Sequence, residues 1–269
     1  MEFIDQLDRK IEINFPPKRI ISIVPSQTEL LCELGHEDKL VGVTKFCVHP
    51  DHIRKSKPVI GGTKNLHIEQ IRSLQPDLII ANKEENVKEQ IEELEKYFPV
   101  WLSDVRNFDD AIVMIKNLGE ITDRQELSYK LIQEIEFEKE KYHSDHNIFA
   151  IHNFPICIYI IWKNPYMIIG GDTFISSMLE LAGFKNLFQD QLRYPEITME
   201  DIQIANPQIV FLSSEPYPFK EKNIKELQEF MPHAKIILID GEMFSWYGSR
   251  LQFSFQYFAE LRKQITNTM

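Results

Sequence analysis

The sequence has few cysteines, and their arrangement does not predict disulfide bonds. Cys32, Cys47 and Cys157 are the only three in 269 residues. Their number is odd and none forms a C-x-x-C pair, so a disulfide framework is not expected. This fits a reducing compartment. It does not exclude export, because many exported proteins of this size need no disulfide.

Long apolar runs and basic runs are also missing. The longest wholly apolar stretch is Ile156 to Trp162, whereas a membrane-spanning helix needs about 20 residues. The chain has 30 Lys+Arg against 41 Asp+Glu, a net charge of −11. An acidic chain without a basic run is not expected to bind nucleic acid or an anionic membrane surface. Residues Met1 to Asp5 have neither the basic nor the apolar segment of a secretory signal, so the chain as written shows no export signal.

Catalytic signatures are absent as well. The sequence contains no G-x-S-x-G nucleophile elbow, no G-x-x-x-x-G-K-S/T phosphate loop and no G-x-G-x-x-G after an expected strand. It offers no nucleophile–base pair at a recognisable spacing. We therefore expect a protein that is not an enzyme and has no intrinsic cofactor, and we keep an enzyme on this fold as a separate class of hypothesis.

Continuous apolar runs alternate with amphipathic segments along the chain. Continuous runs predict strands that are buried on both faces of a parallel sheet, and their alternation with helices predicts an α/β fold. The clearest expected strands are Ile20–Val24, Leu78–Ala81, Ile156–Ile161, Ile209–Leu212 and Ile236–Ile239. The expected helices between them are Thr28–Leu34, Val87–Tyr97, Thr173–Leu181 and Ile224–Phe230.

The middle of the chain, from Asp109 to His143, has no strand-like run. Asp123 is a suitable N-cap for a helix that continues to about Tyr142. A helix of about 20 residues spans about 30 Å, which is long enough to join two lobes. We expect an N-terminal α/β lobe at 1–108, a connecting helical segment at 109–145 and a C-terminal α/β lobe at 146–269.

Two parts of the sequence repeat each other at a constant spacing. The segment Gln75-Pro76-Asp77-Leu78-Ile79-Ile80-Ala81 corresponds to Asn206-Pro207-Gln208-Ile209-Val210-Phe211-Leu212, and Glu84 corresponds to Glu215, each 131 residues later. Such a register favours two similar, Rossmann-like lobes with parallel sheets, joined by one long helix.

Several segments resemble a known family of receptors. They are Arg19 to Leu30 with Gly35, Gly42-Val43-Thr44, Leu74 to Ala81, Leu179 to Gly183, and Ala205-Asn206-Pro207. In order and spacing they resemble the helical-backbone (class III) periplasmic substrate-binding proteins of ATP-driven importers, and within that family the cobalamin and ferric-siderophore receptors. The resemblance covers about Lys18 to Leu261.

The resemblance implies a fold, a function and partners. Members of this family have two α/β lobes joined by one long helix, bind their ligand in the cleft between the lobes and are not enzymes. They are periplasmic or lipid-anchored, and a monomer is expected. The ligand implied is a large chelate, cobalamin-like or a ferric siderophore, which itself carries cobalt or iron. The protein partner implied is the membrane permease of an ABC-type importer.

Two glutamates are candidates for docking on that permease. In the family, one exposed glutamate on each lobe enters an arginine pocket of the permease. Glu84 and Glu215 occupy equivalent repeat positions after equivalent strands, as such a pair should, and Glu85 is the alternative to Glu84. The alternative interpretation is a pair of solvated surface carboxylates in an acidic protein.

The candidate ligand-binding residues follow expected strands, because sites in open parallel sheets lie outside the carboxyl ends of the strands. Aromatic walls suit a large planar ligand, although any single ring can instead be a core residue. Ser26 lies in the first strand-to-helix turn, whose N–H groups could meet an anion or a carbonyl; the alternative is a helix that Ser26 or Thr28 caps. Arg250 could bind an anionic ligand or anchor its own loop. The full set is Ser26, Thr44, Lys45, Phe46, Lys64, Trp162, Tyr166, Tyr194, Phe244, Trp246, Tyr247 and Arg250; we expect at least three of its aromatic rings to share one cavity.

The identity of the ligand stays open at this point. The cobalamin receptor carries a tryptophan in the loop where this chain has Gly61-Gly62-Thr63-Lys64. Lys45 and Lys64 would favour a ligand with carboxylates, such as an acidic siderophore, haem propionates or citrate. Direct metal binding has one weak candidate, the Cys-x-His-x-x-His segment of Cys47, His49 and His52, with no matching pair of histidines in the C-terminal half. A cytoplasmic carrier or sensor of the same fold is a further alternative.

Overall fold

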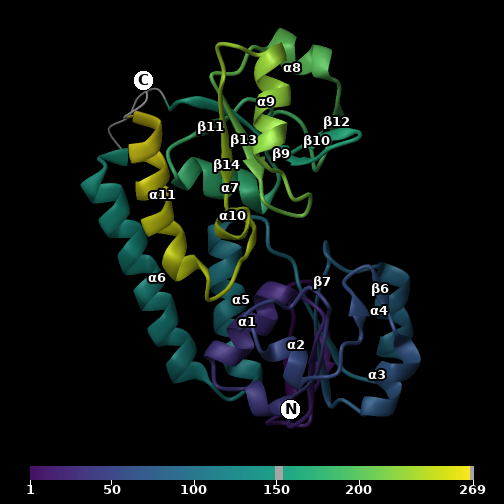
Figure 1. The fold of residues 1–269 in the computed structure, drawn as a ribbon. Helices are drawn as coiled ribbons and strands as arrows, with labels where there is room; N and C mark the ends of the chain where they lie inside the picture. Colours follow the sequence, from purple (N-terminus) through teal and green to yellow (C-terminus); the bar gives the residue numbers. More distant parts are fainter. Residues whose placement is uncertain (149–153, 267–269) are drawn as a thin grey trace. The chain divides into compact units, whose positions relative to one another are not determined.

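The computed structural model describes residues 1–148 and 154–266, which form two compact units (Figure 1). The first unit consists of Met1–Val105, Asp109–Glu136 and Trp246–Gln252. The second unit holds Arg106–Phe108, Phe137–Ser245 and the residues from Phe253 onward. Neither unit is a single continuous piece of chain, because the polypeptide returns to the first unit near its C-terminal end.

The first unit is built on a four-stranded parallel sheet with the strand order β4-β3-β7-β8. All residues of β3 and β7 are buried, which confirms the prediction that these strands are covered on both faces. The strands are β3 (Ile20–Ser22), β4 (Leu40–Val43), β7 (Leu78–Asn82) and β8 (Val100–Ser103).

Helices cover both faces of this sheet. Ile71 of α3 (Ile68–Leu74) and Ile91 and Leu94 of α4 (Lys88–Glu95) pack into one hydrophobic cluster with sheet residues. Figure 1 shows α1 (Pro25–Glu33) and α5 (Phe108–Ile121) on the other side of the strands. The smaller elements are β1 (Glu2–Ile4), β2 (Lys10–Glu12), a 3-10 turn (Glu37–Lys39), α2 (Ile53–Ser56), β5 (Gly61–Gly62) and β6 (Asn65–Leu66).

The sheet of the second unit has the order β12-β10-β9-β13-β14, and β11 also pairs with β9. Strands β9, β11, β13 and β14 pair in parallel, as predicted for β9, β13 and β14, whereas β10 is antiparallel to both of its neighbours, β9 and β12. The difference arises at Asn164-Pro165, where Asn164 has a φ of 65° and reverses the chain directly after β9. The strands are β9 (Ile156–Trp162), β10 (Tyr166–Ile168), β11 (Lys185–Asn186), β12 (Glu196–Ile197), β13 (Ile209–Ser213) and β14 (Lys235–Ile239).

The helices of the second unit pack through apolar side chains on its sheet. Ile202 of α8 and Leu227 of α9 join Ile158 and Val210 of the sheet in one cluster, and Figure 1 shows α9 lying across the strands. The helices are α7 (Phe174–Leu181), α8 (Met199–Ala205), α9 (Glu221–Phe230), α10 (Glu242–Ser245) and α11 (Leu251–Thr266).

A single unbroken helix, α6 (Gln125–Asp145, 21 residues), carries the chain from the first unit to the second. Its residues belong to the first unit up to Glu136 and to the second from Phe137. The predicted connecting helix is therefore confirmed. Its start is corrected, because Asp123 has a φ of 62° and lies in a left-handed turn after α5, so it does not cap α6.

The internal repeat is reproduced residue by residue in the secondary structure. The starts and ends of α3 and β7 each lie 131 residues before those of α8 and β13. The residue that follows each helix is also equivalent: Gln75 (φ 45°) and Asn206 (φ 47°) are the C-caps of α3 and α8, and both have the left-handed conformation. Each is followed by a proline, which cannot continue a helix. The repeat is thus a repeat of structure.

Candidate functional site

The first turn of α1 lies at the carboxyl end of β3, where ligands bind in open parallel sheets. Its N-cap residue is Val24, which provides no side-chain cap. The Thr28 hydroxyl donates to the Val24 carbonyl over 3.0 Å instead of capping the helix. Ser26 is only 3% exposed, and its hydroxyl has no hydrogen-bond partner among the described residues. The alternative of a helix capped by Ser26 or Thr28 is therefore wrong.

The loop after β4 is tied to that turn by a buried thiol. The Sγ atom of Cys47 lies 3.1 Å from the Thr28 hydroxyl and 3.3 Å from the Thr44 hydroxyl. Burial raises the pKa of Cys47, so the thiol stays protonated at neutral pH. Thr44 is fully buried, and its hydroxyl contacts the Cys47 thiol. The next two residues, Lys45 and Phe46, are exposed.

The metal candidate does not assemble. The imidazole of His49 packs against the ring of Trp246 at 5.4 Å, and that of His52 lies 2.8 Å from a Glu37 carboxylate oxygen. The Cys47 thiol forms hydrogen bonds with the hydroxyls of Thr28 and Thr44. Within residues 1–148 and 154–266, no group of three or more His, Cys, Asp or Glu side chains is placed to hold a metal ion.

Phe46 presents an exposed ring at the carboxyl end of β4. The ring is 49% exposed, and the Lys45 ammonium lies 5.0 Å from its centroid. Gly62 lies beneath the pair: a Cβ atom there would come within 3.1 Å of Phe46 Cε2 and 3.2 Å of Lys45 Cε. The Lys64 ammonium donates to the Glu84 carbonyl over 2.6 Å. The Lys45 ammonium thus lies over the Phe46 ring, and the two exposed side chains form one aromatic and cationic surface.

The segment Trp246–Gln252, which we call the strap, belongs to the first unit although both its neighbours in sequence belong to the second. Arg250 donates two hydrogen bonds to the Glu29 carboxylate, at 2.6 and 3.1 Å, and its guanidinium lies 5.2 Å from the Trp246 ring centroid. The Tyr247 hydroxyl donates to the Glu85 carboxylate. Arg250 thus anchors its own loop, which is one of the two roles expected for it.

The carboxyl edge of the second sheet carries a group of rings that we call the aromatic ledge: Trp162, Tyr217 and Phe219. Trp162 ends β9, is 39% exposed and meets Tyr217 edge-on at 5.6 Å. Tyr217 in turn packs on Phe219 at 4.6 Å. Trp162 is one of the residues that the sequence predicts for the ligand, whereas Tyr217, which lies shortly after β13, is not among them.

The other predicted aromatic residues of the second unit are Phe244, Tyr166 and Tyr194, and they differ in burial. Phe244 is fully buried against four rings, at 4.7 to 6.5 Å, so it is a core residue and not part of a ligand surface. Tyr166 is half-buried against the core, and burial raises its pKa. Tyr194 lies with the Arg193 guanidinium 5.8 Å from its ring centroid. Trp162 is therefore the most exposed of the rings predicted for the ligand in the second unit.

Glu84 and Glu215 lie at equivalent places, each two residues beyond its strand. The last residue of each strand holds the loop: Asn82 Oδ1 accepts from the Glu84 amide (2.8 Å), and the Ser213 hydroxyl donates to the Glu215 carbonyl (2.6 Å). Both glutamates are half-buried rather than fully exposed as expected. The Glu215 carboxylate also accepts a hydrogen bond from the Ser245 hydroxyl over 2.6 Å.

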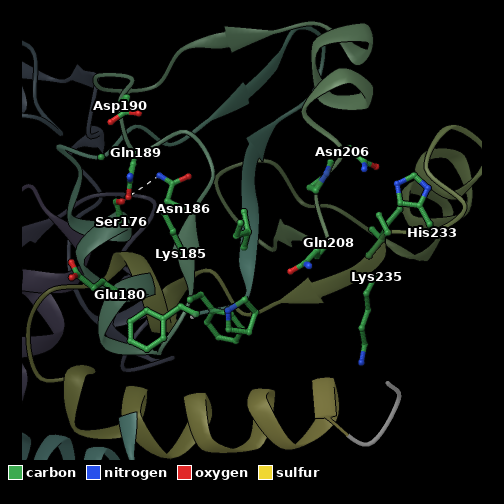
Figure 2. Close-up of a pocket in the computed structure, with 18 of the residues that line it drawn as sticks. Ser176, Glu180, Lys185, Asn186, Gln189, Asp190, Asn206, Gln208, His233 and Lys235 are labelled. Carbon is green, nitrogen blue, oxygen red and sulfur yellow. Dashed lines mark hydrogen bonds between the residues drawn. The ribbon is translucent and has the colours of Figure 1, made fainter. Parts of the chain in front are cut away.

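A hollow of about 1490 Å³ lies at the opposite, amino edge of the second sheet (Figure 2). The starts of β9, β11 and β14 line it, together with polar residues such as Lys185, Gln208 and His233. Asn186 is held there by donating to the Ile169 carbonyl and the Ser176 hydroxyl, at 3.0 and 3.2 Å. None of the residues predicted for the ligand lines this hollow.

Comparison with a family model and with known proteins points to the same kind of protein in each case. A family model described as "Periplasmic binding protein" matches residues 20–234. The vitamin B12-binding protein of Vibrio campbellii is 26% identical over 206 residues, which cover 74% of this chain and 72% of that protein. An ABC transporter substrate-binding lipoprotein of Bacillus subtilis, itself uncharacterized, is 24% identical over 92% of this chain and 80% of its own length.

A solved structure extends the comparison to the whole fold. The crystal structure of a periplasmic solute-binding protein from Staphylococcus epidermidis, named as a possible iron-binding protein, has a TM-score of 0.76 and 25% identity. The match covers 93% of this chain and 99% of that one. No helix in the described ranges is both long and apolar enough to span a membrane.

Proposed function

The chain belongs to the periplasmic binding protein family, whose members are substrate-binding receptors and not enzymes, and we propose that it delivers a large metal chelate to the permease of an ABC-type importer. The chelate is cobalamin-like or a ferric siderophore. Similarity to a vitamin B12-binding protein and to a possible iron-binding protein supports this class of ligand.

The observation that carries the proposal is the position of exposed rings at the carboxyl edges of both sheets. Phe46 follows β4 in the first unit, and Trp162 ends β9 in the second. Their exposed fractions are 49% and 39%. Rings in such positions bury a large ligand area at little entropic cost.

Docking on the permease completes the proposal. Glu84 and Glu215 each occupy the same position after the same strand of their unit. Two carboxylates so related by the internal repeat suit two equivalent arginine clusters on a symmetric permease. Charge-assisted pairs of this kind set orientation and association rate more than affinity.

A ligand screen tests the proposal directly. Cobalamin, cobinamide, haem and ferric chelates are added in turn, and tryptophan fluorescence and thermal unfolding are recorded. A ligand at 100 times its dissociation constant stabilises the folded state by about 2.7 kcal/mol. Trp101 is fully buried and Trp246 nearly so. A Trp162→Phe variant therefore shows which part of the fluorescence change comes from Trp162 of the aromatic ledge. If no chelate shifts the unfolding temperature, the proposed ligand class is wrong.

A further inference from the structure

The start of α1 offers several hydrogen-bond donors that the described residues leave unused. Pro25 has no N–H group, and the amides of Ser26 and Gln27 come too early in the helix for an intrahelical acceptor. The first bond of this kind is made by Thr28, whose amide donates to the Val24 carbonyl over 2.9 Å. Two backbone N–H groups therefore remain directed out of the helix end.

Two buried hydroxyls add to these amides. Ser26 and Ser249 are 3% and 2% exposed, and neither Oγ atom has a partner in the described part of the chain. Gly248, the residue before Ser249, lies against the helix start, because a Cβ atom on Gly248 would lie 3.0 Å from the Ser26 carbonyl oxygen. Buried hydroxyls normally have a partner, so the hydrogen-bonding capacity of these two is unused within the described part of the chain.

The electrostatic surroundings favour a negatively charged occupant. The helix start carries partial positive charge, and the first turn of α1 contains no acidic residue. Lys45 lies in the loop that Cys47 ties to Thr28. The two carboxylates near the strap are already engaged, Glu29 by Arg250 and Glu85 by the Tyr247 hydroxyl.

In the second unit, a side chain satisfies an amide at the corresponding helix start. At the start of α7, the Thr173 hydroxyl accepts from the Ser176 amide over 3.2 Å and donates to the Gly170 carbonyl over 2.9 Å. At α1 the corresponding acceptor is missing, and Val24 stands at the N-cap.

We propose that the first turn of α1, with the hydroxyls of Ser26 and Ser249, is a subsite for an oxyanion group of the ligand, a carboxylate or a phosphate. This rests on the proposed function, because the group belongs to the transported chelate. It narrows the ligand to molecules that carry at least one such group, and it assigns Ser249 a binding role.

Nuclear magnetic resonance of the ¹⁵N-labelled full chain tests the subsite. Inorganic phosphate, acetate and chloride are titrated at constant ionic strength. The amide signals of Ser26, Gln27 and Ser249 should shift in a saturable way with phosphate or acetate and not with chloride. The stronger of the two anions identifies the source of the oxyanion.

Variants separate this subsite from general charge effects. Ser26→Asp places a carboxylate at the site and should weaken anion binding at least tenfold. Asn65→Asp makes the same change of charge at an exposed position of the first unit and should leave it unchanged. The double change Ser26→Ala and Ser249→Ala keeps the backbone donors and should weaken binding several-fold.

Competition decides whether the anion site belongs to the ligand. Phosphate or acetate should weaken the binding of every chelate that binds. If cobinamide, which has no phosphate or carboxylate, binds fully and neither anion shifts the three amides, the subsite is refuted while the receptor proposal stands. Anion shifts without competition would indicate an adventitious ion only and would also refute it. Failure of all chelates to bind would instead count against the proposed function.

Discussion

Arg250 reaches Glu29 across 221 residues of sequence and binds both of its carboxylate oxygens. Their side chains are 11% and 15% exposed, so this is an ion pair largely removed from water. It fixes the strap, and the strap carries Trp246 and Tyr247. The pair thus fixes the position of these two aromatic side chains.

Removing one partner of this pair should be costly. Arg250→Met leaves the Glu29 carboxylate buried without its cation, and we expect the free energy of unfolding to fall by about 3 kcal/mol. Urea unfolding followed by circular dichroism measures the loss. The double variant Glu29→Gln with Arg250→Met should recover part of it, because neither charge then remains. Equal, additive losses from the two changes would contradict a coupled pair.

The aromatic ledge should contribute to ligand affinity. Trp162→Ala or Tyr217→Ala is expected to weaken chelate binding by about 2 kcal/mol, the effect of removing a central aromatic contact. Isothermal titration calorimetry with any chelate that binds provides the measurement. Tyr97→Ala is a matched control, since Tyr97 is a 47% exposed ring stacked near Arg72 on a different surface. Unchanged affinity in both ledge variants would remove the ledge from the ligand site.

The docking glutamates should act on transport and not on ligand binding. Reversing both Glu84 and Glu215 to lysine is expected to abolish stimulation of the permease's ATP hydrolysis, because like charges then face its arginines. Ligand affinity should change less than twofold. The double variant Glu89→Lys with Glu221→Lys makes the same change of net charge at exposed positions and should still stimulate. A fall in ligand affinity in the first variant would place the two glutamates in the binding site.

A buried histidine should make stability depend on pH below neutrality. Burial, together with the charges of Lys39 and Arg124, lowers the pKa of His36 from 6.5 to about 4. The unfolded chain therefore takes up a proton at higher pH than the folded one. Stability is complete above about pH 6.5 and is lost as the pH falls toward 4, by an amount on the order of 2 kcal/mol. Unfolding at pH 7 and pH 5 should show this slope, and His36→Leu should flatten it.

The alternation of apolar runs was sufficient to predict the α/β class, the main parallel strands and the connecting helix. The 131-residue repeat predicts the correspondence of α3–β7 with α8–β13. Hydrophobic burial and helix periodicity are local properties of the chain, which is why these features are readable. The short strand β8 and the hairpin β9–β10 were not predicted, because the apolar run from Val100 to Leu102 follows a proline and is shorter than the other runs, and a turn at Asn164 carries little signal on its own.

The candidate site was predicted less well, for a physical reason. Phe244 and Trp246 are neighbours in sequence, yet one is a core ring of the second unit and the other packs with the first. Which face a ring takes depends on residues far along the chain, such as Phe258 for Phe244 and His49 for Trp246. The missing side-chain cap on α1 could not be predicted from residue type either. Ser26 and Thr28 are both good capping residues by type, but the helix begins at Pro25 with Val24 at its N-cap.

The return of the strap to the first unit has a consequence for the order in which the molecule is made. During synthesis from the N-terminus, the residues of α1 leave the ribosome more than two hundred residues before Arg250. Until then Glu29 lacks its ion pair with Arg250, and the first turn of α1 has no strap across it. The first unit can therefore reach its final packing only after almost the whole second unit has been translated. Nascent chains that stop at Ser245 should be open to proteases at α1, even though every strand of both sheets is already present.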